Sequence, residues 1–288
     1  MKSKSNISKI LVPTDFSPEA INAMTFAAQV ARLTQAEVTL LYVLNYPGGS
    51  AFDTMMSEYE DPSKNKYVQE VLKDVNEVFQ KYEISKTFKD VKVVKKIQIG
   101  NPFTNISDEI SQNKTDLVVI GTSGLGNARN NNLIGSNTEK VVRRASCPVI
   151  SVKEDIDLKK LKSIVFPTTF EKESDSMALF LKDFSKMIKA EVKMVFINTP
   201  AYFKTQHMIE KAYEKYVTKN KIKDFFFMVY NELTEEKGIL HYSADIDADM
   251  IALATHGRKG LAHLFAGSIA EDLTRHTKRT LLTLKTWN

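Results

Sequence analysis

Residues 9–46 read KILVPTDFSPEAINAMTFAAQVARLTQAEVTLLYVLNY, and this stretch decides the expected fold. Ile10–Pro13 is a short apolar run typical of a strand. Ser17 and Pro18 then supply a helix cap and a first-turn proline. Apolar residues follow at helical spacing, and Val38–Leu44 is a second apolar run without alternation, as in strands buried on both faces. A strand, a helix and a second buried strand predict a parallel sheet.

The same pattern occurs again in the second half of the chain. Residues 162–199 read KSIVFPTTFEKESDSMALFLKDFSKMIKAEVKMVFINT and align with the first stretch without a gap. A repeat of this length predicts a domain duplication and not a solenoid. Two further pairs of segments also align: TDLVVIGTSG (115–124) with ADMIALATHG (248–257), and IGSNTEKVVRRASCPVISVK (134–153) with AGSIAEDLTRHTKRTLLTLK (266–285).

We therefore expect two α/β domains, 1–153 and 154–288, joined through the charged segment KEDIDLKK (153–160). Strands that alternate with helices predict a parallel sheet with helices on both faces. In the first copy we expect further strands at Val91–Ile99, Leu117–Ile120 and Val149–Val152, and helices at 64–83, Pro102–Gln112 and Ser136–Arg144. In the second copy we expect strands near 163–167, 191–197, 224–229, 249–254 and 280–285.

The composition excludes several classes of protein. Of the 288 residues, 43% are hydrophobic and 26% charged, which is typical of a globular chain. No apolar run approaches the roughly 18 residues of a membrane span, and the basic N-terminus lacks the apolar core of a signal peptide. The net charge of +5 comes from lysines interleaved with acids, without the clustered stripe of a nucleic-acid surface. We expect a cytoplasmic protein with no nucleic-acid or membrane partner.

The cysteine and histidine residues do not predict a metal site. Cys147 is the only cysteine, which excludes a disulfide within the chain and a cysteine-rich zinc site. The five histidines show no HExxH spacing. We expect Cys147 to be a buried packing residue and not a redox thiol.

Ligands of open parallel sheets bind beyond the carboxyl ends of the strands, where the strand order reverses. This rule selects three places in each copy: the end of the first strand, the end of the second strand, and the loop after the fourth strand. The first two places contain these residues: Pro13, Thr14, Asp15 and Val43 in the first copy, and Pro167, Thr168, Thr169 and Ile197 in the second.

The loop after the fourth strand of the second copy favours an anion. Residues 255–268 read THGRKGLAHLFAGS. Gly267 is expected to begin a helix, so free backbone N–H groups and the positive end of the helix dipole converge there. Glycine lets the backbone approach an anion closely, and the Ser268 hydroxyl adds a hydrogen bond or caps the helix. Phosphate is the expected anion, although neither copy contains GxxxxGK[ST] and GLGNAR (124–129) departs from the dinucleotide pattern.

With these motifs, the chain resembles a tandem universal stress protein, with two UspA-like domains. The characteristic loop of that family has the form G-x2-G-x9-G-[ST] and follows a PTDFS-like turn after the first strand. A similar turn, a similar loop and the final strand occur in this order in each copy. The resemblance implies Rossmann-like domains, similar to adenine nucleotide alpha hydrolases, each with five parallel strands in the order 3-2-1-4-5. It also implies ATP binding in many members, dimers through the last strand and a role in stress survival. Some members lack the loop and do not retain nucleotide.

The resemblance transfers a nucleotide site to each copy, and the two copies depart from the pattern differently. Ten residues separate Gly124 from Gly135 in the first copy, one more than the pattern. The second copy has the family spacing. However, Ala254 replaces the first glycine of the loop, which is Gly121 in the first copy, and Thr169 replaces the family aspartate, which is Asp15 in the first copy. The expected loop residues are Gly121, Ser123, Gly124, Gly135, Ser136 and Asn137 in the first copy, and Ala254, His256, Gly257, Arg258, Gly267, Ser268 and Ile269 in the second.

Three residues have two interpretations each. Asp15 either orders a ribose or a metal ion, or caps the helix that follows. His256 either touches a phosphate or is a solvated loop residue. Arg129 either reaches a phosphate or is solvated. The first copy is the better adenosine pocket on these grounds, and the second is the better phosphate cradle.

The first hypothesis is a stress-response protein that binds ATP, with or without magnesium, and so alters its contacts with an unknown protein partner. The alternative is an interaction module that retains the fold and has lost the ligand. We expect no enzyme beyond slow ATP hydrolysis, because there is no G-x-S-x-G elbow and no Ser-His-Asp set. The strands at 149–152 and 280–285 are flat apolar edges, which predicts an intramolecular pseudo-dimer and allows a further homodimer.

Overall fold

The computed structural model describes residues 7–45, 66–83, 85–122, 135–256 and 279–286. Its elements follow the predicted alternation of strands and helices. In the first half they are β1 (Lys9–Pro13), α1 (Pro18–Thr34), β2 (Glu37–Leu44), α2 (Lys66–Glu83), the 3₁₀ turn η4 (Lys86–Phe88), β3 (Val93–Ile99), α3 (Pro102–Asn113), β4 (Leu117–Gly121), α4 (Ser136–Arg144) and β5 (Val149–Val152).

The second half repeats the strand order and adds two 3₁₀ turns, η6 and η7; residues 257–278, between its last two strands, lie outside the described residues. Its elements are β6 (Ser163–Pro167), η6 (Lys172–Ser174), α5 (Asp175–Ile188), β7 (Glu191–Asn198), η7 (Pro200–Tyr202), α6 (Gln206–Asn220), β8 (Phe225–Asn231), α7 (Glu235–Asp245), β9 (Met250–His256) and β10 (Thr280–Thr286).

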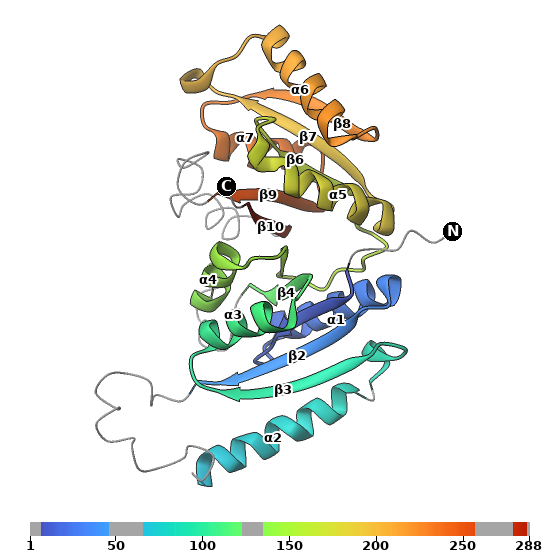
Figure 1. Cartoon of the computed structure of the whole chain (residues 1–288), viewed down its shortest axis with the longest axis vertical. Helices are drawn as coiled ribbons and strands as arrows, with labels where there is room; N and C mark the ends of the chain where they lie inside the picture. The colour runs from blue at the N-terminus through green and yellow to red at the C-terminus, as the bar shows by residue number, and fades with distance from the viewer. Residues whose placement is uncertain (1–6, 46–65, 84, 123–134, 257–278, 287–288) are drawn as a thin grey trace, which may run out of the picture.

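All ten strands belong to one sheet in the order β3-β2-β1-β4-β5-β10-β9-β6-β7-β8 (Figure 1). Each half therefore has the order 3-2-1-4-5, as the resemblance implied. Within each half all strand pairs are parallel. The strand order reverses beside β1 and beside β6, and these are the two switch points at which a ligand site is expected.

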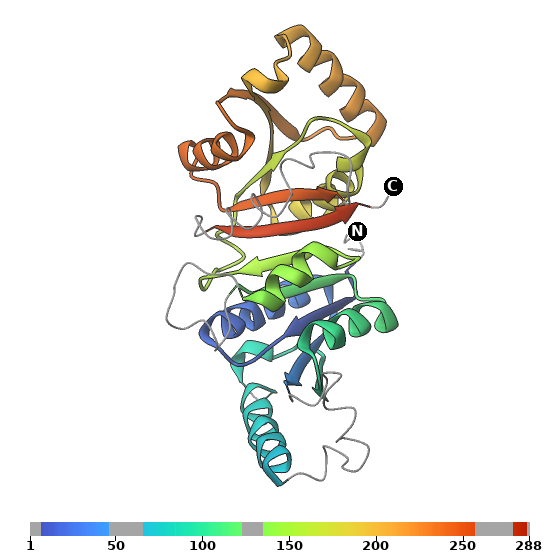
Figure 2. The same cartoon turned by 90° about the vertical axis from the view of Figure 1, so that its left-hand side faces the viewer.

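The two halves meet edge to edge through β5 and β10, which are antiparallel. Leu282 lies opposite Ile150, and Thr283 lies opposite Val149. The red strand β10 and the green strand β5 lie side by side at the middle of the sheet in Figure 2. The predicted contact between these two strands is thus confirmed, and it hides both apolar edges within one continuous sheet. The division of the chain at residues 153 and 154 stays a prediction.

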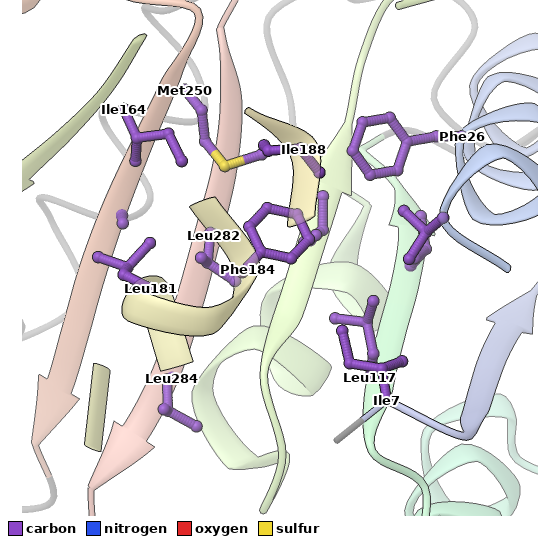
Figure 3. Close-up of a cluster of buried hydrophobic side chains, with 14 of the residues drawn as sticks. Ile7, Phe26, Leu117, Ile164, Leu181, Phe184, Ile188, Met250, Leu282 and Leu284 are labelled. Carbon is purple, nitrogen blue, oxygen red and sulfur yellow. The ribbon is translucent and has the colours of Figure 1, made fainter. Parts of the chain in front are cut away.

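One face of the sheet carries a continuous hydrophobic core that crosses both halves. It includes Phe26 of α1 and Leu117 of β4 in the first half, and Phe184 of α5 and Leu282 of β10 in the second (Figure 3). Helices α1, α2, α5 and α6 cover this face. The opposite face has smaller clusters under α3 and α4 in the first half and under α7 in the second.

The segment between the halves is packed more tightly than its charge predicts. Leu158 and Leu161 are 3% and 1% exposed and belong to the main core. The Gln29 side chain of α1 accepts from the Leu158 N–H at 2.7 Å and donates to the Ile156 carbonyl at 3.0 Å. A glutamine on the first helix therefore fixes the connection, which the composition of the segment alone does not show.

Candidate functional site

The turns after β1 and β6 have the same backbone conformation. The Phe16 N–H donates to the Thr14 hydroxyl at 3.1 Å, and the Phe170 N–H donates to the Thr168 hydroxyl at 3.0 Å. Both phenylalanines are in the left-handed region, with φ of 60° and 64°. A bulky residue is unfavourable there by about 1–3 kcal/mol, so the surrounding contacts must hold the turn. Pro13 and Pro167 end the two strands, and Pro13, Thr14 and Thr168 are buried.

Asp15 begins the connection to α1 and acts in its capping. Its Oδ1 accepts from the Ser17 N–H at 3.0 Å, and the Ser17 hydroxyl accepts from the Ala20 N–H at 3.3 Å. The side chain of Asp15 is half-buried. The structure thus supports the capping interpretation, and a ligand role for the same carboxylate stays a prediction. Thr169, its counterpart, is also half-buried but has no carboxylate.

Val43 and Ile197 are the penultimate residues of the second strand of each half, and their surroundings differ. Val43 is half-buried and pairs with Gln98 of β3. Ile197 packs closely on the backbone of α7: a Cβ added at Gly238 would lie 2.4 Å from the Ile197 Cγ2. In the second half, the isoleucine side chain therefore fills the space beside the strand end.

The end of β4 lies against the beginning of α4. The Gly135 N–H donates to the Thr122 carbonyl at 2.9 Å, and the Thr138 hydroxyl donates to the Gly121 carbonyl at 2.8 Å. Gly135 is the N-cap residue of α4 and provides no side-chain cap. Since β4 neighbours β1, the N-terminus of α4 is held at the switch point of the first half. Ser136 and Asn137, the first two residues of α4, are exposed and half-buried.

Two orphaned polar atoms lie at the same edge of the first half, and sequence analysis did not select them. The Thr122 Oγ1 follows β4, and the Gln98 Oε1 is opposite Val43 in the sheet. Both atoms are buried and have no hydrogen-bond partner among the described residues. A buried polar atom without a partner is unfavourable, so each is a candidate contact for a ligand. The register between β2 and β3 places Gln98 beside Val43, and this register is not evident from the sequence.

Gly121 has a packing role that the sequence analysis did not anticipate. A Cβ at this position would lie 2.7 Å from the Glu19 carbonyl carbon and 2.8 Å from the Ala20 nitrogen, both backbone atoms of α1. The glycine is therefore needed for the close approach of β4 to α1, whether or not a phosphate binds nearby. In the second half, Ala254 is buried at the same place, where η6 replaces the first turn of the helix.

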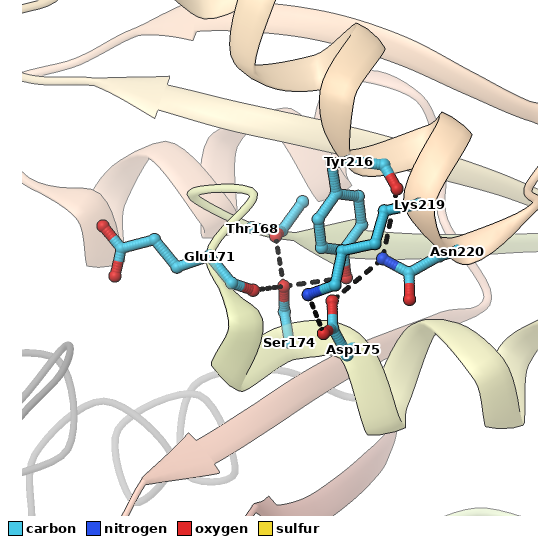
Figure 4. Close-up of polar contacts among 7 residues, drawn as sticks. All are labelled: Thr168, Glu171, Ser174, Asp175, Tyr216, Lys219 and Asn220. Atoms are coloured by element: carbon cyan, nitrogen blue, oxygen red, sulfur yellow. Dashed lines mark hydrogen bonds and ion pairs between the residues drawn. The ribbon is translucent and has the colours of Figure 1, made fainter.

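A hydrogen-bond network occupies the switch point of the second half (Figure 4). The Thr168 hydroxyl donates to the Ser174 Oγ at 3.0 Å, and the Ser174 hydroxyl is 2.8 Å from the Tyr216 hydroxyl. Burial raises the pKa of Tyr216, and its hydrogen bond with Ser174 opposes this shift. Asp175 at the start of α5 pairs with Lys219 and accepts from Asn220 at 2.8 Å. The strand end at Thr168 is thus saturated by contacts within the protein.

Aromatic rings support the corresponding turn of the first half. Phe16 stacks on Tyr42 and Tyr82, with ring centroids 5.8 and 6.0 Å apart. The pKa of Tyr42 is raised by its burial and, to a smaller extent, by the nearby charge of Asp15. This electrostatic contact places the Asp15 carboxylate close to the aromatic wall.

The remaining predicted residues are not described. Ser123, Gly124, Gly257, Arg258, Gly267, Ser268 and Ile269 lie outside the described residues, and so does Arg129. His256 ends β9, and only its backbone is described. Among the residues that are described, no group of histidine, cysteine, aspartate or glutamate could hold a metal ion. None of the described helices has the length and apolar character of a membrane span.

Comparison with known proteins gives consistent matches. The sequence profile of the Universal stress protein family matches residues 6–153 and 232–285. A Staphylococcus aureus (strain USA300) protein named as a universal stress protein is 30% identical over 147 residues, which cover 51% of this chain and 84% of the relative. The crystal structure of a universal stress protein from Archaeoglobus fulgidus DSM 4304 covers 98% of this chain and 99% of its own, with a TM-score of 0.73 and 18% identity.

A second solved structure, from Pseudomonas aeruginosa UCBPP-PA14 and assigned to the same family, has a TM-score of 0.65 and 17% identity. It covers 98% of this chain and 95% of its own. At these identities the two structures show that the fold is shared over the whole chain. The profile does not match residues 154–231, which include β6, the network at Thr168 and Ile197.

Proposed function

The chain belongs to the universal stress protein family, and we propose that it binds an adenine nucleotide at the switch point of its first half. The observation that carries the proposal is that this end of the first half has an α4 N-terminus without a side-chain cap and two orphaned buried atoms, the Thr122 Oγ1 and the Gln98 Oε1. A helix N-terminus binds phosphate through its free N–H groups and its dipole. The Gln98 oxygen is suited to the exocyclic amino group of adenine, because that group is a hydrogen-bond donor.

Asp15 is the proposed contact for the ribose. Its carboxylate already accepts the Ser17 N–H, and a carboxylate has enough acceptor positions to take a hydroxyl as well. Thr14 and Pro13 would form the floor of this pocket through their backbone. Within the proposal, Gly121, Ser123, Gly124, Gly135, Ser136 and Asn137 surround the phosphates, and Val43 meets the base through its backbone.

The second half is the weaker candidate for the adenosine. Its strand ends at Thr168 and Ile197 are occupied by the Ser174 network and by packing on Gly238. The family profile also omits this part of the chain. The loop between Gly257 and Gly267 has the family spacing, so a phosphate contact in the second half remains a separate prediction.

We infer a binding protein in which ATP, with or without magnesium, stabilises one arrangement and changes the contacts with a protein partner. Turnover would be slow at most, because the sequence has no G-x-S-x-G elbow and no Ser-His-Asp set. The second candidate function is an interaction module without nucleotide. The internal hydrogen bonds of Thr168 favour this second candidate for the second half.

The test is the free energy of unfolding with and without MgATP, measured on protein shown to be free of nucleotide. At about 100 times its dissociation constant, a ligand adds roughly 2.7 kcal/mol. Gly135→Val should abolish this gain, because the side chain would cover the N–H groups of α4. The backbone at Gly135 (φ −62°, ψ 134°) suits valine, so the fold should persist. Asp15→Asn keeps an acceptor for Ser17 and should weaken binding about tenfold.

Thr169→Ala is the matched control in the second half and should leave the gain unchanged. Stabilisation that survives Gly135→Val and disappears in Gly267→Val would move the site to the second half. If millimolar MgATP gives no stabilisation in the wild type, the interaction module becomes the better account of the chain.

A further inference from the structure

A cavity of about 330 Å³ lies in the second half, at the amino ends of its strands β7 and β8, and the proposed nucleotide site lies in the first half. It is bounded by the C-terminal half of α5, by the segment between α6 and β8, and by the amino ends of β7 and β8. Its lining residues are Lys182, Ser185, Lys186, Ala190, Lys221, Ile222, Lys223, Asp224 and Phe225. All of them lie within residues 154–231, which the family profile does not match.

The cavity is strongly positive. Four lysines against one aspartate leave a net charge of +3 in its lining. Lys186 pairs with Asp224 at 3.4 Å, whereas Lys182, Lys221 and Lys223 make no ion pair within the part of the chain that the structure describes. Mutual repulsion between uncompensated lysines is unfavourable, and a bound anion would relieve it.

Helix dipoles explain only part of this charge. Lys186 lies in the last turn of α5, and Lys221 is the C-cap residue of α6, where cations are favourable. Lys182 is six residues before the end of α5, and the dipole effect falls off within the last turn. Lys182 is nevertheless half-buried in the lining, which is unusual for an unpaired lysine.

At the equivalent position of the first half, the space that forms the cavity is filled by other residues. Ala28 and Ala31 of α1 correspond to Lys182 and Ser185, and they are 0% and 2% exposed. Arg32, the counterpart of Lys186, donates to the carbonyls of Lys86 and Lys89 at 3.3 Å. The connection between helix and strand spans residues 84–92 in the first half but only 221–224 in the second. The shorter connection and the exchanged side chains leave the cavity open.

We propose that this cavity is a second ligand site, which binds a small polyanion of the phosphate class, such as a diphosphate group. Its volume lies in the range of small-molecule sites, and Ser185, a buried residue of the lining, has a hydroxyl that adds a hydrogen-bond donor to the lysines. A pocket of this size fits a compact ligand better than a length of acidic peptide. The site is separate from the proposed nucleotide site, since its lining residues all belong to the second half and the nucleotide site belongs to the first.

The experiment measures the binding of inorganic pyrophosphate to the full chain by calorimetry at 150 mM salt. The test variant is Lys182→Ala with Lys223→Ala, because alanine is the residue of the first half at the position of Lys182. We expect at least a tenfold weaker affinity in this variant. Lys215→Ala removes an exposed lysine of α6 outside the cavity and should change the affinity less than twofold. Gly135→Val should also leave it unchanged.

Three outcomes would overturn the proposal. One is the absence of pyrophosphate binding at 10 mM. Another is binding that Gly135→Val abolishes and the double lysine variant retains, which would assign pyrophosphate to the nucleotide site. The third is tight binding of hexaglutamate that pyrophosphate does not displace, which would indicate an acidic protein segment as the partner. Thermal unfolding of each variant confirms that the fold is intact before binding is compared.

Discussion

Individual residues of this chain have roles that depend on their depth in the fold. Phe16 and Phe170 occupy left-handed backbone positions, and each is held by a hydrogen bond to a threonine and by stacked rings. Cys147 is 7% exposed and packs in the core beneath α3 and α4. The expected packing role of this cysteine is thus confirmed.

The buried thiol of Cys147 should be unreactive in the native protein. Burial raises its pKa to about 12 from an ordinary value of 9.0, so the reactive thiolate is scarce at neutral pH. Because the folded pKa is the higher one, the thiol's contribution to stability is complete below pH 9 and is lost as the pH rises toward 12. We expect slow reaction with a thiol reagent at pH 8 and rapid reaction in denaturant. Fast labelling of the native protein would contradict this environment.

At the scale of elements, the approach of β4 to α1 fixes the geometry of the candidate site. Gly121 allows the end of β4 to contact the backbone of α1. The carbonyl of Thr122, the next residue, accepts a hydrogen bond from the Gly135 N–H at the N-terminus of α4. Gly121 was expected to belong to a phosphate loop. The structure gives a second reason for glycine at this position, the close packing of β4 on α1, which is separate from ligand binding. The second half accepts Ala254 because α5 begins after the additional turn η6.

The substitution Gly121→Ala should destabilise the protein by about 1–3 kcal/mol, because the new Cβ would meet main-chain atoms that have no freedom to move away. The reciprocal change in the second half, Ala254→Gly, should cost only about 0.5–1 kcal/mol through chain entropy. Urea unfolding curves of both variants give the comparison. Equal losses in the two halves would show that β4 and α1 are less closely packed than the structure indicates.

At the scale of the whole molecule, the seam between β5 and β10 turns two repeats into one sheet. Ile150 and Leu282 are opposite each other at this seam, and both are fully buried. The core on the helix side is continuous across it. The two halves should therefore unfold together.

We expect a single calorimetric transition for the wild type. Ile150→Ala should lower the free energy of unfolding by about 2–5 kcal/mol, since a buried side chain is lost from the seam. Ile156→Ala, in the half-buried connection, should have a smaller effect. Two separate transitions in the wild type would contradict the view of the sheet as one cooperative unit.

Local sequence patterns determined much of this protein. The apolar runs, the Ser17–Pro18 helix start and the internal repeat predicted the strands and the parallel order, because burial and backbone preference act over short distances. The flat apolar edges at 149–152 and 280–285 predicted their pairing, because such edges must be covered. Tertiary structure alone decided which residues meet at the site. The register that places Gln98 beside Val43, the closure of the second switch point by Tyr216 and the lysine cavity depend on contacts between distant segments. Side chains from separate elements converge only after packing fixes the distances between them, and no local pattern encodes that geometry.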